Sequence, residues 1–147
     1  MKLNGTLSIF VIITILCLSI VSCEKQKMQG KLIITEQEFI LTKDRENSFT
    51  IEAKGKIKNI GEVDVKKVVV TGYCRSCGEE WIPGRWFVSN IEKAPEQKDI
   101  IGYLAVGSEE SFSFKEVADL LLTTGQETPE LPDNLEIVIE SFDNVEE

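Results

Sequence analysis

The sequence predicts an all-β fold, an immunoglobulin-like β-sandwich of about seven strands. Two observations support this prediction, and one segment departs from it. Apolar and polar residues alternate in several short segments, most clearly from Phe49 to Ile57, as in strands with one buried face. Turn residues separate these segments roughly every 8 to 12 positions, a spacing typical of sandwiches. One segment, residues 116–122, has helical spacing instead, with Val117, Leu120 and Leu121 at i, i+3 and i+4, and predicts a short helical turn.

The first half of the predicted domain is rich in strand-forming residues. Residues 31–42 contain two apolar clusters and predict one or two strands at an edge of the sandwich, followed by a charged turn at 43–47. After the alternating strand, turn residues at 59–62 lead to a valine-rich strand. Its apolar positions shift by one residue after Lys66 and Lys67, as a β-bulge produces. We expect the alternating strand and the valine-rich strand to form a hairpin.

The second half contains a strong turn signal at Pro83-Gly84. This pair favours a type II turn, and pairing of its flanks would place Ile82 opposite Arg85 and Trp81 opposite Trp86. Further strands are expected at 87–91, 99–105, 111–115 and 135–142, with a long loop at 126–134.

The N-terminus has the layout of a secretion signal, an apolar run from Leu7 to Val21 behind a single charge at Lys2. Within it, Ile20-Val21-Ser22-Cys23 resembles the lipobox of bacterial lipoproteins, in which the cysteine is acylated and becomes the mature N-terminus. Two alternatives fit less well. A membrane anchor needs about 20 apolar residues, more than this interrupted run provides. An ordinary signal peptide would carry an A-x-A cleavage site, which is missing before Cys23.

The resemblance to lipoproteins implies three parts. They are a lipoprotein signal peptide at 1–22, a lipidated tether at 23–30 and a β-sandwich domain at 31–147. Cys23 is the expected lipidation site. We therefore expect an exported protein of the cell envelope, anchored through lipid to the outer membrane or to the outer face of the cytoplasmic membrane. Two or three acyl chains on one cysteine are enough to hold a protein stably on a bilayer.

The charge balance and the absence of histidine limit the functions that the chain can have. The chain carries 16 basic and 25 acidic residues, a formal net charge of −9. This balance argues against nucleic acid and anionic headgroups as partners, because both are negatively charged themselves. No histidine is present, which excludes Ser-His-Asp and Cys-His catalysis and zinc sites that use imidazole. We predict no enzyme, no catalytic residue and no cofactor.

Cys74-Arg75-Ser76-Cys77 is the one motif of the predicted domain that suggests chemistry. In an exported protein an even pair of cysteines is usually bonded, which predicts a small disulfide that stiffens its loop. Thiol-disulfide exchange is a second interpretation, although the following glycines and proline argue against the helix that activates thioredoxin-like cysteines. A metal site is the third. It would need more ligands, from Glu79 and Glu80 or from a second copy of the chain.

Aromatic residues crowd the same region. Trp81 and Trp86, with Tyr73 beside them in sequence, are expected first as core residues, because a sandwich core needs large apolar side chains. On this interpretation both tryptophans point inward. The alternative is a platform for a peptide or a glycan, with Arg85 as an anchor at the interface. Tyr73, Trp81, Arg85 and Trp86 are therefore the candidate contact surface.

Three segments resemble the FxLYD group of bacterial and archaeal immunoglobulin-like domains. They are Gly55–Gly61, Val65–Tyr73 and Leu104–Phe112, which correspond to a strand and turn, a valine-rich strand and a second turn of that family. Cys74 stands where the family has aspartate, and Val106 stands where it has proline. The resemblance implies an immunoglobulin-like sandwich without a catalytic site.

These observations lead to two hypotheses about function. The first is a lipid-anchored envelope lipoprotein that works as a non-catalytic interaction or accessory module, with an envelope protein or a glycan as its partner. The second is a thiol-redox or metal-handling lipoprotein that uses Cys74 and Cys77.

Overall fold

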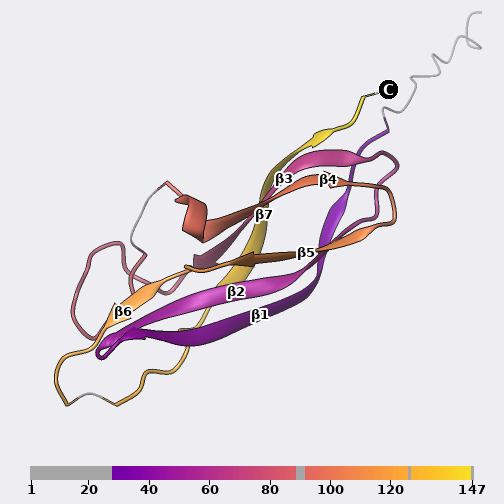
Figure 1. The fold of residues 1–147 in the computed structure, drawn as a ribbon. Coiled ribbons are helices and arrows are strands. Elements are labelled where there is room, and N and C mark those ends of the chain that lie inside the picture. Colours follow the sequence, from indigo (N-terminus) through magenta and orange to yellow (C-terminus); the bar gives the residue numbers. More distant parts are fainter. Residues whose placement is uncertain (1–27, 89–91, 126, 147) are drawn as a thin grey trace, which may run out of the picture.

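The computed structural model describes residues 28–88, 92–125 and 127–146. The predicted signal peptide and lipidation site, Cys23, lie outside the described residues. The described chain forms two antiparallel sheets packed face to face (Figure 1), which confirms the predicted all-β sandwich of about seven strands. The strands are β1 (Leu32–Arg45), β2 (Ser48–Asn59), β3 (Val65–Cys74), β4 (Lys98–Leu104), β5 (Glu109–Phe114), β6 (Asp119–Leu121) and β7 (Leu135–Asn144), and the short 3-10 turn η1 spans Pro95–Gln97.

Each sheet is built around one central strand. In the first sheet β2 lies between β1 on one side and β5 and β6 on the other, and in the second sheet β3 lies between β4 and β7. As predicted, the segment after residue 31 is an edge strand. It forms one strand, β1, which extends to Arg45 and turns at Glu46 and Asn47 into β2.

The predicted hairpin between the alternating strand and the valine-rich strand is wrong. β2 and β3 belong to different sheets, and residues 60–64 cross from one sheet to the other. Both strands are central and have a fully buried apolar face, represented by Ile57 and Val65, so these faces pack against each other instead of the strands pairing edge to edge. The buried Asn59 shapes the crossing. Its side-chain amide donates hydrogen bonds to the carbonyl oxygens of Val63 at 2.9 Å and Leu104 at 3.2 Å.

The predicted β-bulge is present in β3. Val65, Val68 and Val70 are all fully buried, although a regular strand would not bury both Val65 and Val68. Lys67 has a φ of 52°, and the register between β3 and β7 shifts between Lys66 and Val69. The extra residue of the bulge shifts the alternation by one position, so Val68 and Val70 face the core on the same side as Val65.

The predicted helical turn at 116–122 is wrong. Val117 and Ala118 are fully buried, and residues 119–121 form strand β6. Backbone hydrogen bonds hold this segment on β2, from Val117 N–H to Ile51 O at 2.7 Å and from Ile51 N–H to Ala118 O at 3.0 Å. A short apolar run with i, i+3, i+4 spacing fits a helix or a strand equally well. Here the segment forms a strand because its backbone pairs with the edge of β2.

The core lies between the two sheets. Its buried apolar residues come mostly from β2, β3 and β5, namely Ile51, Ala53, Ile57, Val65, Val68, Val70, Cys74, Leu104, Phe112, Phe114, Val117 and Ala118. Gly72 of β3 lets the sheets approach closely. A Cβ atom at this position would lie 2.8 Å from a methyl carbon of Val117 and 2.9 Å from the ring of Phe114.

The two described ends of the chain lie together at one end of the sandwich (Figure 1). Gly30 N–H donates to Asn144 Oδ1 at 3.0 Å, and Val145 N–H donates to Asp64 O at 2.9 Å. β3 runs from this end to Cys74 at the opposite end. β2 starts at that opposite end, with Ser48, and runs back. The loops that follow Cys74 and Leu121 therefore gather at the end opposite to the N-terminal segment.

Candidate functional site

Residues 75–88, which we call the closing loop, connect the two sheets at the end opposite to the termini. The loop leaves β3 in the second sheet and reaches β6 in the first. Two backbone hydrogen bonds of 2.9 Å join Phe87 and Asp119, and Gly84 N–H donates to Leu121 O at 2.8 Å. The last part of the closing loop therefore extends the first sheet beyond β6. Of the strand expected at 87–91, the structure describes only Phe87, as an isolated bridge residue, and Val88.

The turn at the tip of the closing loop forms as predicted. Arg85 N–H donates to Ile82 O at 3.0 Å, and Gly84 has a φ of 80°, a value that favours glycine. The flanks do not continue as a hairpin, because Trp86 O accepts instead from Gly78 N–H at 3.0 Å. Trp81 is therefore not paired with Trp86.

Cys74 and Cys77 form a disulfide at the start of the closing loop, with their Cα atoms 5.4 Å apart. The structural interpretation of the motif is thus present in the structure. In this state neither sulfur is a thiolate, the form that binds metals and attacks other disulfides. The same segment is fastened to the loop before β7, since Arg75 N–H donates to Asn134 O at 3.0 Å and the Ser76 hydroxyl donates to Asp133 O.

The two tryptophans have different environments. Trp86 is half-buried and packs against the core, and its indole N–H donates to Glu130 O at 3.2 Å. Trp81 is 55% exposed. The prediction that both point inward is right for Trp86 and wrong for Trp81. Trp86 is held in place by its bridged neighbour Phe87, whereas Trp81 precedes the turn and lies outside any strand.

The four residues of the candidate contact surface do not form one patch. Only Arg85 and Trp86 share a groove, which has a volume of about 780 Å³. Cys77 of the disulfide and two glutamates line this groove as well. Its full lining is Ser76, Cys77, Gly78, Glu79, Glu80, Ile82, Gly84, Arg85, Trp86 and Pro132. The fold thus separates residues that the sequence grouped, because Tyr73 and Trp81 do not line this groove.

Trp81 borders a second groove, of about 440 Å³, on the other side of the closing loop, together with Phe87 and Asp119. Burial raises the pKa of Asp119 to about 6, and a hydrogen bond with Thr50 opposes part of this shift. The neighbouring carboxyl groups of Glu116 and Asp44 contribute to this same rise. Nothing in the sequence singles out Asp119, because its burial comes from the closing loop and β2.

Tyr73 lies outside both grooves, on the outer face of the second sheet. Its hydroxyl donates to Glu140 at 2.8 Å, and this hydrogen bond raises the pKa of Tyr73. The Arg75 guanidinium and the Lys93 ammonium each lie 4.4 Å from the centre of the Tyr73 ring. Burial lowers the pKa of Lys93. Tyr73 is thus engaged by its own neighbours, and it is not part of the concave surface.

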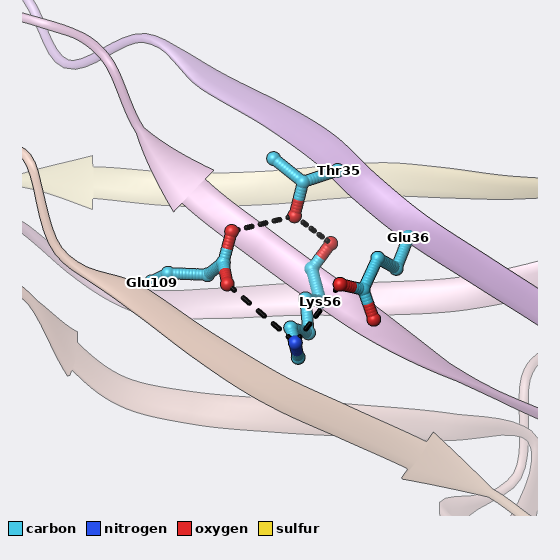
Figure 2. Close-up of polar contacts among 4 residues, drawn as sticks. All are labelled: Thr35, Glu36, Lys56 and Glu109. Atoms are coloured by element: carbon cyan, nitrogen blue, oxygen red, sulfur yellow. Dashed lines mark hydrogen bonds and ion pairs between the residues drawn. The ribbon is translucent and has the colours of Figure 1, made fainter.

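A polar cluster that the sequence did not predict lies on the outer face of the first sheet (Figure 2). The Lys56 ammonium lies 2.9 Å from a Glu36 oxygen and 3.9 Å from a Glu109 oxygen, and Thr35 donates to Glu109 at 2.8 Å. The hydrogen bond with Glu36 is the main reason that the pKa of Lys56 is raised. These groups satisfy one another and join β1, β2 and β5. Because Thr35 and Glu109 are 74 positions apart, only the fold brings them together.

Among residues 28–88, 92–125 and 127–146, no three His, Cys, Asp or Glu side chains are grouped to hold a metal ion. The same residues include no helix long and apolar enough to span a membrane.

Comparison with known proteins adds no relative. No protein-family model matches the chain, and searches among curated proteins and among solved structures found no similar protein.

Proposed function

We propose that this protein is a lipid-anchored lipoprotein of the cell envelope and works as a non-catalytic interaction or accessory module. Its contact surface is the closing loop. One observation supports this surface above others: the hydrogen-bonded turn of the closing loop exposes Trp81 by 55% and Ile82 by 42%, and Ile82 lines the groove that contains Arg85. Exposed apolar side chains on a rigid loop beside an arginine are typical of protein interfaces.

The arrangement of the two ends favours this role. With lipid on Cys23, the segment to Met28 reaches at most about 18 Å from the membrane surface. β2, with 12 residues, measures roughly 40 Å along its length. The closing loop then faces away from the bilayer, where an envelope protein or a glycan can reach it. The resemblance to FxLYD-type immunoglobulin-like domains, which implies no catalytic site, agrees with such a role.

Site-specific photocrosslinking in intact cells tests the proposal. A photoreactive amino acid replaces Trp81, and in a second strain it replaces Ile100, which is 57% exposed on β4. We expect a discrete crosslinked partner from position 81 and none from position 100. Equal crosslinking from both positions, or none from position 81, would argue against the closing loop as the contact surface.

A second function, thiol-disulfide exchange, is favoured by one observation. Cys77 lines the groove beside Arg85, so a partner's thiolate has a route to the disulfide. In this exchange a partner dithiol is oxidised to a disulfide while the Cys74–Cys77 bond is reduced to two thiols. Equilibration with glutathione measures the potential of the pair. A value below about −300 mV is typical of structural disulfides and would contradict the redox role. Zinc binding by the reduced protein tests the metal-handling variant.

A further inference from the structure

The groove beside the disulfide combines an apolar floor with one cation. Trp86 supplies a fixed ring, because its indole N–H is already bonded to Glu130 O at 3.2 Å. Ile82, 42% exposed, and Pro132 complete the apolar part. Backbone hydrogen bonds on both sides of the turn fix the position of Arg85. A rigid floor of this kind loses little conformational entropy when a ligand binds.

Arg85 is unusual among the arginines of this acidic chain. Arg45 lies 3.6 Å from Asp44, and Arg75 is paired with Glu136. Within the described residues, the Arg85 side chain has no hydrogen bond or ion pair, although Glu79 and Glu80 line the same groove. In a chain with 25 acidic and 16 basic residues, an arginine without a carboxylate partner is free to accept one from outside.

We propose that this groove binds an extended peptide segment in which a carboxylate adjoins apolar residues. The inference rests on the proposed function, since it names the chemistry of the partner at the closing loop. The Arg85 guanidinium binds the carboxylate through two parallel hydrogen bonds. The apolar residues of the peptide lie on Trp86, Ile82 and Pro132, which exclude water around the ion pair.

The groove distinguishes a carboxylate from more highly charged anions. Glu79 and Glu80 lie in the same groove, and the chain has a net charge of −9. A phosphate dianion or a polyanion would meet these charges with only one arginine in compensation, and repulsion between like charges weakens its binding. A single carboxylate carries less charge than a phosphate dianion, so Glu79 and Glu80 repel it less, and the Arg85 guanidinium can pair with it directly.

Calorimetry with the full-length protein in detergent tests the inference with defined tetrapeptides. One peptide has three apolar residues followed by glutamate, with both ends blocked. A second replaces glutamate by glutamine, a third is wholly apolar with a free C-terminal carboxylate, and a fourth carries phosphoserine. We expect the glutamate peptide, the free-carboxylate peptide or both to bind at least 10-fold more tightly than the glutamine peptide, and the phosphoserine peptide to bind more weakly. The stronger of the two identifies a side-chain or a terminal carboxylate.

Variants of the protein locate the interaction. Arg85→Gln should weaken binding of the carboxylate peptide at least 10-fold, and Arg85→Lys should weaken it less, because lysine keeps the charge but loses the two-pronged geometry. Arg45→Gln is the matched control, since it removes a surface charge outside the groove, and it should leave binding unchanged. Ile82→Ser, at an exposed position, should weaken all the peptides together.

Several results would overturn the inference: equal affinity for the glutamate and glutamine peptides, tighter binding of phosphoserine, no binding of any peptide, or an Arg85→Gln variant that binds normally. A different result would contradict the proposed function, namely the absence of crosslinks from position 81 in cells. That result does not depend on whether the peptides bind. If crosslinks from position 81 persist but the carboxylate has no effect on peptide binding, the closing loop is a contact surface for a partner of different chemistry.

Discussion

Asp119 has nothing unusual in its sequence context, and its environment comes from the fold. Its backbone pairs with Phe87 of the closing loop, and its side chain lies near Thr50 and Glu116. Burial is the main reason that its pKa rises from 3.8 to about 6. The folded state therefore binds the proton more tightly than the unfolded state does, and the charged form of Asp119 destabilises the fold.

We predict that Asp119→Asn stabilises the protein at neutral pH. The stability that the protonated Asp119 provides is complete below about pH 4 and is lost as the pH rises through about 6. Asparagine is neutral throughout and keeps a carbonyl acceptor for Thr50. The expected gain is about 1 kcal/mol at pH 8, reduced by the partial solvent exposure of the site, and close to zero at pH 4. Urea unfolding at both pH values measures the difference. A gain independent of pH would contradict this explanation.

Single residues also show how far the sequence predicts the candidate site. Arg85 and Trp86, two of the candidate contact residues, line one groove, because they are neighbours in sequence beside a turn that is visible as local pattern. The exposure of Trp81 and the engagement of Tyr73 with Glu140 were not predicted. Both depend on which segments meet in space, and residues 73 and 140 are 67 positions apart.

At the scale of elements, the sequence predicts which face of a strand is buried better than it predicts the neighbouring strand. The alternation in β2 and the bulge in β3 were both recognised, because side-chain period and phase are local properties. The pairing of β2 with β1, β5 and β6 was not predicted, since two strands with apolar faces pack across a sandwich as readily as they pair within a sheet. A different ambiguity, between helix and strand in a short apolar run, led to the helical interpretation of β6.

The close packing of the two sheets depends on Gly72. We predict that Gly72→Ala destabilises the fold by about 1–3 kcal/mol, because the new methyl group would overlap Val117 and Phe114 at distances below 3.0 Å. Gly102→Ala on β4 is the matched control. A Cβ atom there meets nothing within 4 Å, and its effect should be neutral or slightly stabilising. Equal destabilisation in thermal unfolding would show that packing at Gly72 is not the cause.

The disulfide is expected to act on the closing loop and not on the whole fold. A ring of four residues contributes only about 2 kcal/mol through chain entropy, and Gly84 and Phe87 remain bonded to β6 without it. Replacing Cys74 and Cys77 by serine should accelerate hydrogen exchange near residues 75–80 and leave residues 84–87 protected. Loss of protection throughout β2 and β3 would mean that the bond supports the fold itself.

At the scale of the whole molecule, the proposed account assigns different tasks to the two ends of the sandwich. The end where the described chain begins, at Met28, also holds Asn144 near Gly30. The opposite end carries the disulfide, the exposed Trp81 and the groove with Arg85. The net charge of −9 weakens binding to polyanions.

The mass of the intact protein extracted from membranes tests whether the domain is lipid-anchored and whether a disulfide holds its closing loop. The account predicts a chain that begins at Cys23, carries the added mass of two or three acyl chains, and lacks two hydrogens relative to the reduced protein. Mild reduction should restore the two hydrogens and leave the acyl mass in place. A mass that includes residues 1–22, or that shows Cys23 without lipid, would contradict the account.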